Sequence, residues 1–144
     1  MTLDDGVLVI GPGEGRTFQL GPDRRMDFKV LGEQTGGAFS FADGPAGAGF
    51  QPPAHIHATQ EEAFYIIDGL VDFILAEKTV RAEPGTFVIV RRGTMHSFKV
   101  VGPSAARMLT MFSPAGEEEK QFEALEQNAD RIDWSSGEWF KRTP

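Results

Sequence analysis

The chain contains three histidines, and their positions relative to nearby glutamates suggest a metal site. His55 and His57 are two residues apart, so both imidazoles project from one face if this segment is extended. Pro52 and Pro53, just before them, disfavour a helix and favour that extended conformation. His96 follows a glycine-containing turn and precedes another β-type segment. Imidazole and carboxylate ligands suit iron, manganese, cobalt, nickel, copper or zinc, so we predict one divalent transition metal as the cofactor.

A glutamate is the natural fourth ligand, and two adjacent glutamates compete for that place. Glu61 and Glu62 open the apolar segment that follows the histidine pair. Because neighbouring residues of a strand face opposite ways, only one of the two side chains can point toward the histidines. The other is then expected in solvent.

Two segments around these residues resemble the two sequence motifs of the cupin superfamily. The resemblance covers roughly residues 26–112. The chain departs from the second motif at Arg91, where the family usually has proline, and at Val100, where it usually has asparagine. Neither position is a metal ligand in the family. The matching residues are Gly49, His55, His57, Glu62 and Gly69 in the first motif and Gly85, Gly93 and His96 in the second.

This resemblance implies a fold, a ligand set and an activity. The fold is all-β, an antiparallel double-stranded β-helix (the jelly-roll or cupin barrel), carried by a single domain over residues 1–144. The metal ligands are His55, His57, Glu62 and His96, which leaves Glu61 in solvent. In size the chain is most similar to small quercetin dioxygenase-like cupins. The family also implies a homodimer.

The expected ligand set limits the chemistry of the site. Three neutral imidazoles and one carboxylate leave one or two metal positions for water, dioxygen or a chelating substrate. Because all three histidines are then committed to the metal, we assign the catalytic proton transfer to Glu62. We predict a metal-dependent dioxygenase that acts on a small aromatic or enolisable substrate. The alternatives are a non-catalytic cupin that binds a metal or small molecule, and an isomerase or lyase that uses the metal as a Lewis acid.

Composition sets further bounds on function. The 144 residues suffice for one domain, and 12 phenylalanines can fill a small barrel. The net charge of −7 offers no basic surface for nucleic acid or for acidic membranes. Without cysteine the chain has no disulfides, thiolate ligands or thiol nucleophiles. We find no signal peptide or membrane-spanning stretch and predict a cytoplasmic protein.

Short β-type segments separated by glycine and proline turns dominate the first 112 residues. This pattern is typical of an antiparallel sandwich or barrel. Asp68-Gly69 predicts a hairpin between its two flanking strands. Tyr65 should face away from the site. We expect strands at residues 7–10, 17–20, 26–31, 38–42, 63–67, 70–75, 79–82, 86–90, 97–101 and 108–112. We expect a phenylalanine core from Phe39, Phe41, Phe64, Phe73, Phe87 and Phe98.

The pattern changes after residue 113. Phe122 and Leu125 recur at helical spacing, so we predict an amphipathic helix over residues 115–129 that packs on the barrel. Acidic residues 117–119 suit the positive end of the helix dipole, and we assign them no further role. Residues 132–144 form an aromatic tail. Its Trp134, Trp139 and Phe140 need burial against the barrel or against a second subunit.

Overall fold

The computed structural model describes residues 6–136, which form nine strands, one α-helix and two short 3-10 helices. The strands are β1 (Arg16–Gln19), β2 (Arg25–Val30), β3 (Ser40–Ala46), β4 (Glu61–Asp68), β5 (Val71–Ile74), β6 (Thr79–Ala82), β7 (Phe87–Val90), β8 (Ser97–Val100) and β9 (Ala106–Ser113). The helices are η1 (Gly32–Gln34), α1 (Glu117–Gln127) and η2 (Ala129–Arg131).

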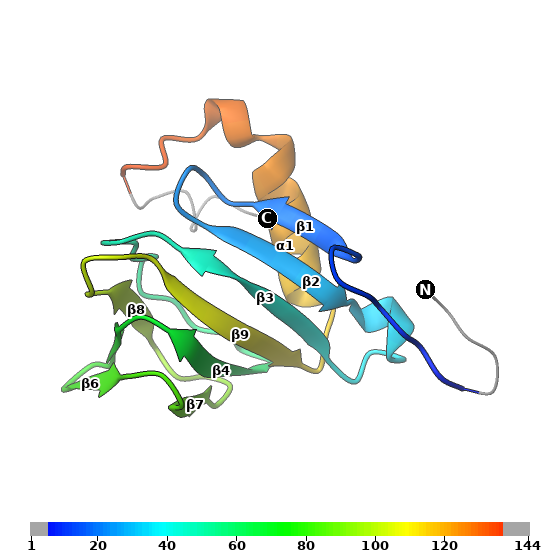
Figure 1. Cartoon of the computed structure of the whole chain (residues 1–144), viewed down its shortest axis with the longest axis horizontal. Helices are drawn as coiled ribbons and strands as arrows, with labels where there is room; N and C mark the ends of the chain where they lie inside the picture. Colours follow the sequence, from blue (N-terminus) through cyan, green and yellow to red (C-terminus); the bar gives the residue numbers. More distant parts are fainter. Residues whose placement is uncertain (1–5, 137–144) are drawn as a thin grey trace.

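The strands make two antiparallel sheets (Figure 1). The larger sheet has the order β1-β2-β3-β9-β4-β7, and the smaller has the order β6-β5-β8. Chain order and strand order differ, because β9 returns between β3 and β4. This arrangement is the predicted double-stranded β-helix with one C-terminal helix, so the predicted fold class is confirmed.

One half of the core lies between the two sheets. The inward side chains of β4, β5 and β8 meet there, because residues of a strand alternate between its faces. Phe64, Phe73 and Phe98 pack with ring centroids 5.0–6.0 Å apart. All three are buried, as predicted.

The other half of the core lies between the first strands of the large sheet and α1. Phe18, Phe28 and Phe112 project from the sheet, and Phe122 projects from the helix toward them. Their ring centroids are 5.7–6.5 Å apart. Each buried phenylalanine contributes roughly 1.5–3 kcal/mol relative to an exposed one. The amphipathic helix predicted over residues 115–129 is thus α1, packed on the barrel.

The predicted hairpin at Asp68-Gly69 is wrong. β4 pairs with β7 and β9, whereas β5 pairs with β6 and β8, so this turn carries the chain from one sheet to the other. Gly69 has a φ of +86°, and a Cβ there would lie 2.8 Å from the Ala106 Cα. Glycine is therefore required here, because a side chain would be strained by the positive φ and would clash with Ala106.

Three of the predicted core phenylalanines face outward. Phe87 is 59% exposed and Phe39 is exposed, while Phe41 is only partly buried. In β3 the small residues Ser40 and Ala42 face inward instead. A period-2 pattern defines the two faces of a strand, but a shift of one residue exchanges them. The strand predicted at residues 7–10 is also wrong, since no strand is assigned there.

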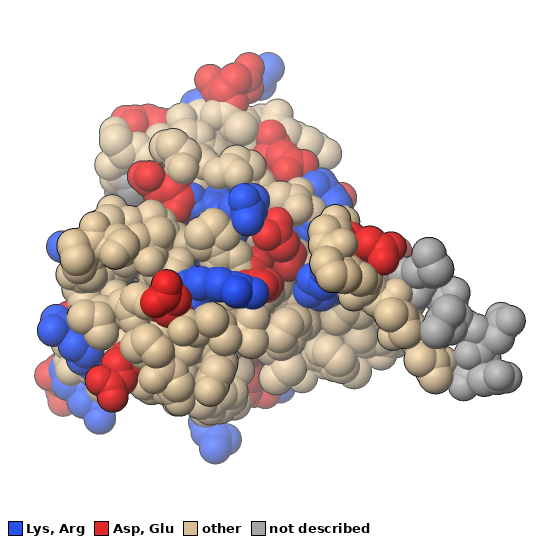
Figure 2. Space-filling view, viewed as in Figure 1, with Lys and Arg blue, Asp and Glu red and all other residues tan. Residues whose placement is uncertain are grey.

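The outer face of the large sheet carries paired charges. Arg107 Nη2 lies 2.6 Å from Asp43 Oδ2, and Arg25 Nε lies 3.1 Å from Asp27 Oδ2. Figure 2 shows acidic and basic side chains next to one another on the face in view, without a broad region of one sign. Within residues 6–136, no helix is long and apolar enough to cross a membrane.

The aromatic tail is described in part. Trp134 is partly buried and packs against the core around Phe18, and its Nε1 donates to the Ala129 carbonyl oxygen at 3.1 Å. A Cβ on Gly21 would lie 2.7 Å from the Trp134 ring. Trp134 is thus buried against its own barrel. Trp139 and Phe140 lie outside the described residues.

Candidate metal centre

Two segments bring the three histidines together. His55 and His57 lie on the connection between β3 and β4, and His96 directly precedes β8. His55 and His96 form an isolated antiparallel bridge, with N-to-O distances of 2.9 and 3.0 Å. The amide of Gly93 donates to the His57 carbonyl oxygen at 2.8 Å. The backbone itself therefore fixes how these imidazoles approach one another.

Glu62 approaches from β4, where alternation points it inward. It is 7% exposed, whereas Glu61 lies on the other side of the strand. Glu61 accepts from Arg92 Nε at 2.6 Å in an ion pair at the surface. The prediction that Glu61 is solvated is confirmed. Tyr65 is exposed on that same outer side, as predicted.

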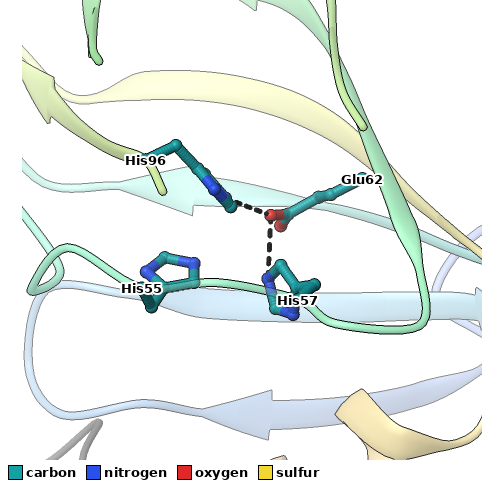
Figure 3. Close-up of side chains that lie close together, drawn as sticks. All are labelled: His55, His57, Glu62 and His96. Atoms are coloured by element: carbon teal, nitrogen blue, oxygen red, sulfur yellow. Dashed lines mark hydrogen bonds and ion pairs between the residues drawn. The ribbon is translucent and has the colours of Figure 1, made fainter. Parts of the chain in front are cut away.

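The four side chains converge on one small volume (Figure 3). One potential ligand atom from each of His55, His57, Glu62 and His96 can be chosen so that all lie within 4.8 Å of one another. The imidazole ring centroids are 4.4–5.5 Å apart. The structure thus brings together all four residues predicted from the sequence. Their role as metal ligands, and the catalytic role of Glu62, stay predictions.

Two backbone carbonyls fix the tautomers of two imidazoles. The His55 Nδ1 lies 2.8 Å from the Pro53 carbonyl oxygen, and the His96 Nδ1 lies 2.8 Å from the Thr94 carbonyl oxygen. A carbonyl oxygen only accepts, so each Nδ1 carries a hydrogen. In the neutral ring the lone pair is then on Nε2. Metal-binding histidines are oriented in the same way by an acceptor on the second nitrogen.

The contacts between Glu62 and two imidazole nitrogens show whether the site could hold a cation. His96 Nε2 lies 3.0 Å from Glu62 Oε1, and His57 Nε2 lies 3.1 Å from the same oxygen. His57 Nε2 is buried, and its geometry gives no hydrogen bond. Two acceptors this close repel unless a proton or metal ion neutralises them. A divalent cation satisfies all these atoms at once, so the residues fit a metal.

Electrostatics keep the site in a ligand-competent form at neutral pH. Burial raises the pKa of Glu62, but the contacts with His57 and His96 outweigh it and lower the pKa to about 2. Burial lowers the pKa of His55 to about 4. Burial also lowers the pKa of His96, but its contact with Glu62 reverses the effect and leaves the pKa raised. Glu62 is therefore ionised and His55 neutral near pH 7.

A cavity opens beside these residues. About 40 Å³ of it is open to the centre of a water-sized sphere, and the empty space including the mouth is about 410 Å³. Apart from His55, His57, Glu62 and Arg24, the lining is apolar: Leu20, Met26, Phe50, Pro52, Phe64, Phe98, Phe112 and Phe122.

Two buried charged residues were missed by sequence reasoning. Arg24, 5% exposed, lines the cavity from the segment just before β2, and no sequence signal distinguished it from a turn residue. Glu118 is 1% exposed at the start of α1, where we had assigned only a helix-dipole effect. That assignment is wrong. Its spacing to Phe122 and Leu125 places it on the buried face of α1, and this signal could have found it.

Comparison with known proteins supports this description of the fold. A family model described as a cupin domain matches residues 45–112. Comparison with curated proteins found no match. Among solved structures, KdgF from Halomonas sp. is 16% identical and aligns over 76% of this chain and 97% of its own, with a TM-score of 0.66. A predicted oxalate decarboxylase from Thermotoga maritima is 21% identical and aligns over 74% of this chain and 99% of its own, with a TM-score of 0.65.

A third structure differs more in length. Ectoine synthase from P. lautus is 21% identical, aligns over 67% of this chain and 68% of its own, and has a TM-score of 0.58. At these identities the likeness concerns the fold, and the names ectoine synthase and oxalate decarboxylase indicate different activities on it. The resemblance to quercetin dioxygenases stays a prediction. The matched domain and the shared fold support the cupin superfamily for this chain.

Proposed function

We propose that this protein is a metal-dependent cupin enzyme that binds one divalent transition metal through His55, His57, Glu62 and His96. The observation that carries the proposal is the convergence of three imidazoles on a buried carboxylate, with ligand atoms within 4.8 Å. Imidazole and carboxylate donors suit iron, manganese, cobalt, nickel, copper or zinc. A bound metal would supply Lewis acidity and, with a redox-active ion, dioxygen chemistry.

The reaction we propose is dioxygenation of a small enolisable substrate. The apolar walls of the cavity exclude water from the reacting atoms. Glu62 is the one carboxylate that lines it, so we assign this residue both metal binding and removal of the substrate proton. The space of about 40 Å³ favours a substrate of few heavy atoms over a multi-ring flavonol. The size of the cavity therefore favours the smaller members of the predicted class of aromatic or enolisable substrates.

Metal analysis of the purified protein tests the site. We expect about one equivalent of a transition metal, lost in His57→Ala while the barrel stays folded. Ile56→Ala is the matched control, because Ile56 lies between the two histidines and is exposed. Undiminished metal content in His57→Ala would contradict the site. Equal loss in Ile56→Ala would indicate damage to the segment instead.

Oxygen uptake with acetylacetone, a small diketone, tests the reaction. Consumption of dioxygen together with the diketone, lost in Glu62→Gln, is expected. Turnover of substrate without dioxygen would favour the isomerase or lyase alternative, in which the metal acts as a Lewis acid only. Metal binding without turnover of any candidate would favour the non-catalytic cupin.

A homodimer and a cytoplasmic location stay predictions. The homodimer was inferred from family resemblance and the aromatic tail, of which Trp134 is buried within its own chain. Sedimentation equilibrium would decide the oligomeric state. A monomer at micromolar concentration would contradict the dimer.

A further inference from the structure

Arg24 places a buried cation on the wall of the candidate metal cavity. It lies between β1 and β2, forms an isolated bridge with Ala46, and is 5% exposed. It lines the same cavity as His55, His57 and Glu62. Among the described residues that line it, the rest are apolar, so within residues 6–136 this guanidinium is the one basic group other than the histidines that the cavity offers.

The guanidinium makes few bonds for its capacity. Its Nη1 donates to the carbonyl oxygens of Arg25, Gly44 and Pro45 at 3.2–3.4 Å, which are long for hydrogen bonds. Within residues 6–136, neither Nε nor Nη2 donates a hydrogen bond and neither is fully shielded from solvent, and the guanidinium forms no ion pair within 4.0 Å. An arginine has five N–H donors, so most of its capacity is unused by the protein.

An unpaired buried cation is expensive. Burial lowers the pKa of Arg24 to about 10, against opposing effects of Glu62, Asp27 and Asp43. The side chain is therefore still charged at neutral pH. Removing an ion from water costs several kcal/mol unless a partner of opposite charge compensates. Neutral carbonyls at long range compensate only in part, so Nε and Nη2 stay available to an anionic ligand.

We propose that Arg24 binds a carboxylate of the substrate, so that the natural ligand is a small organic acid. The inference rests on the proposed function, because it assumes that one end of the ligand meets the metal. The other end then carries the carboxylate that the guanidinium pairs with in a fork. The small cavity limits such a molecule to a few heavy atoms. The opposing hypothesis is that Arg24 only links β2 to β3 through its carbonyl contacts.

Oxalate and oxamide are suitable probes, because they have the same size and shape but differ in charge. Each is titrated into the cobalt-loaded protein, and binding is followed by the visible absorption of Co²⁺. Cobalt content is measured first. We expect oxalate to bind more tightly than oxamide, and Arg24→Met to weaken oxalate by about 10- to 100-fold with oxamide and cobalt content unchanged.

Two further variants separate charge from packing. Arg24→Lys keeps the cation and should recover part of the oxalate affinity. Arg25→Met is the matched control, because Arg25 is exposed and paired with Asp27. It should bind oxalate as the unsubstituted protein does. Wild-type affinity in Arg24→Met would overturn the proposal and leave Arg24 a structural link.

Two other outcomes also decide the matter. If Arg24→Met does not fold, the NMR signal of the Arg24 Nε–H group is measured in the unsubstituted protein instead. This signal must shift when oxalate is added and must not shift when oxamide is added. An unshifted signal overturns the proposal. If cobalt does not bind, the proposed function fails, and calorimetry of the metal-free protein with oxalate tests Arg24 separately. Equal heats for the unsubstituted protein and Arg24→Met, or no binding, would then overturn it.

Discussion

Glu62 and Glu118 are both buried carboxylates, yet their surroundings differ in kind. Glu118 accepts from the Ser40 hydroxyl at 2.5 Å, from the Gln60 side-chain amide, and from the Gly116 amide at 3.2 Å. Every one of these partners is a neutral donor. Glu62 instead has its Oε1 within 3.0–3.1 Å of the Nε2 atoms of His96 and His57, contacts that require a proton or a metal ion between the atoms. A carboxylate satisfied by donors holds a fold together, whereas one opposed by acceptors is prepared for a ligand.

Glu62→Gln should produce the largest effect, on metal binding. We expect the affinity for Co²⁺ to fall by more than about 100-fold, beyond the 10- to 100-fold typical for loss of an outer-shell partner. Competition with a chromophoric chelator measures this. Circular dichroism of the metal-free variant should show that the barrel stays folded. Unchanged cobalt affinity in Glu62→Gln would contradict the metal-binding role that distinguishes Glu62 from Glu118.

Glu118→Ala should act on stability instead. It leaves the Ser40 hydroxyl buried without an acceptor, while the Gln60 amide loses one of its two acceptors and keeps the Pro114 carbonyl oxygen, at a cost of roughly 3 kcal/mol in the free energy of unfolding. Urea unfolding measures this, with Glu117→Ala as the control, because Glu117 is exposed. Metal content of the folded fraction should not change. A loss no greater than that of the control would mean that Glu118 is no structural anchor.

The metal-free protein should lose stability in acid because of His55. His55 has its pKa lowered from 6.5 to about 4, so the unfolded chain binds the proton more readily than the folded one. Its contribution is complete above about pH 6.5 and is lost as the pH falls to about 4. The pKa of Glu62 is lowered from 4.5 to about 2, so its contribution to stability is lost as the pH falls between those two values. Urea unfolding at several pH values should show a smaller loss in His55→Asn between pH 6.5 and 4. An identical profile would contradict the assigned burial effect.

Glu61→Gln should have the smallest effect. Its ion pair with Arg92 is solvent-exposed, and such pairs contribute little because water and salt screen them. We expect cobalt affinity to match the unsubstituted protein and the unfolding midpoint to move slightly, with a smaller shift at high salt. A large loss of cobalt in Glu61→Gln would mean that the two neighbouring glutamates were assigned to the wrong faces.

The same two carboxylates show what sequence can predict. Glu62 was identifiable because its spacing to His57 and Gly69 follows a motif, and strand alternation separates it from Glu61. Glu118 was not, because its partners Ser40 and Gln60 are 78 and 58 residues away. No local pattern encodes such contacts.

The fold shows the same limit. Alternation and turns predicted most strands and an antiparallel sandwich or barrel, and the family resemblance implied the β-helix. Which face of β3 turns inward, however, depends on partners elsewhere in the chain. Ser40 faces inward, where it meets Glu118, and Phe39 is left exposed. Likewise, only the three-dimensional structure shows that Arg24 lines the cavity.

The backbone bridge between His55 and His96 has a practical consequence for identifying the natural metal. Because two amide hydrogen bonds already hold these ligand-bearing segments together, the protein organises its donors before any ion arrives. Such a site accepts whichever transition ion is abundant, following the general order of affinities that peaks at copper. The ion found after overproduction will therefore report the growth medium as much as biology. Exchange at controlled free-metal concentrations is the measurement that identifies the native ion.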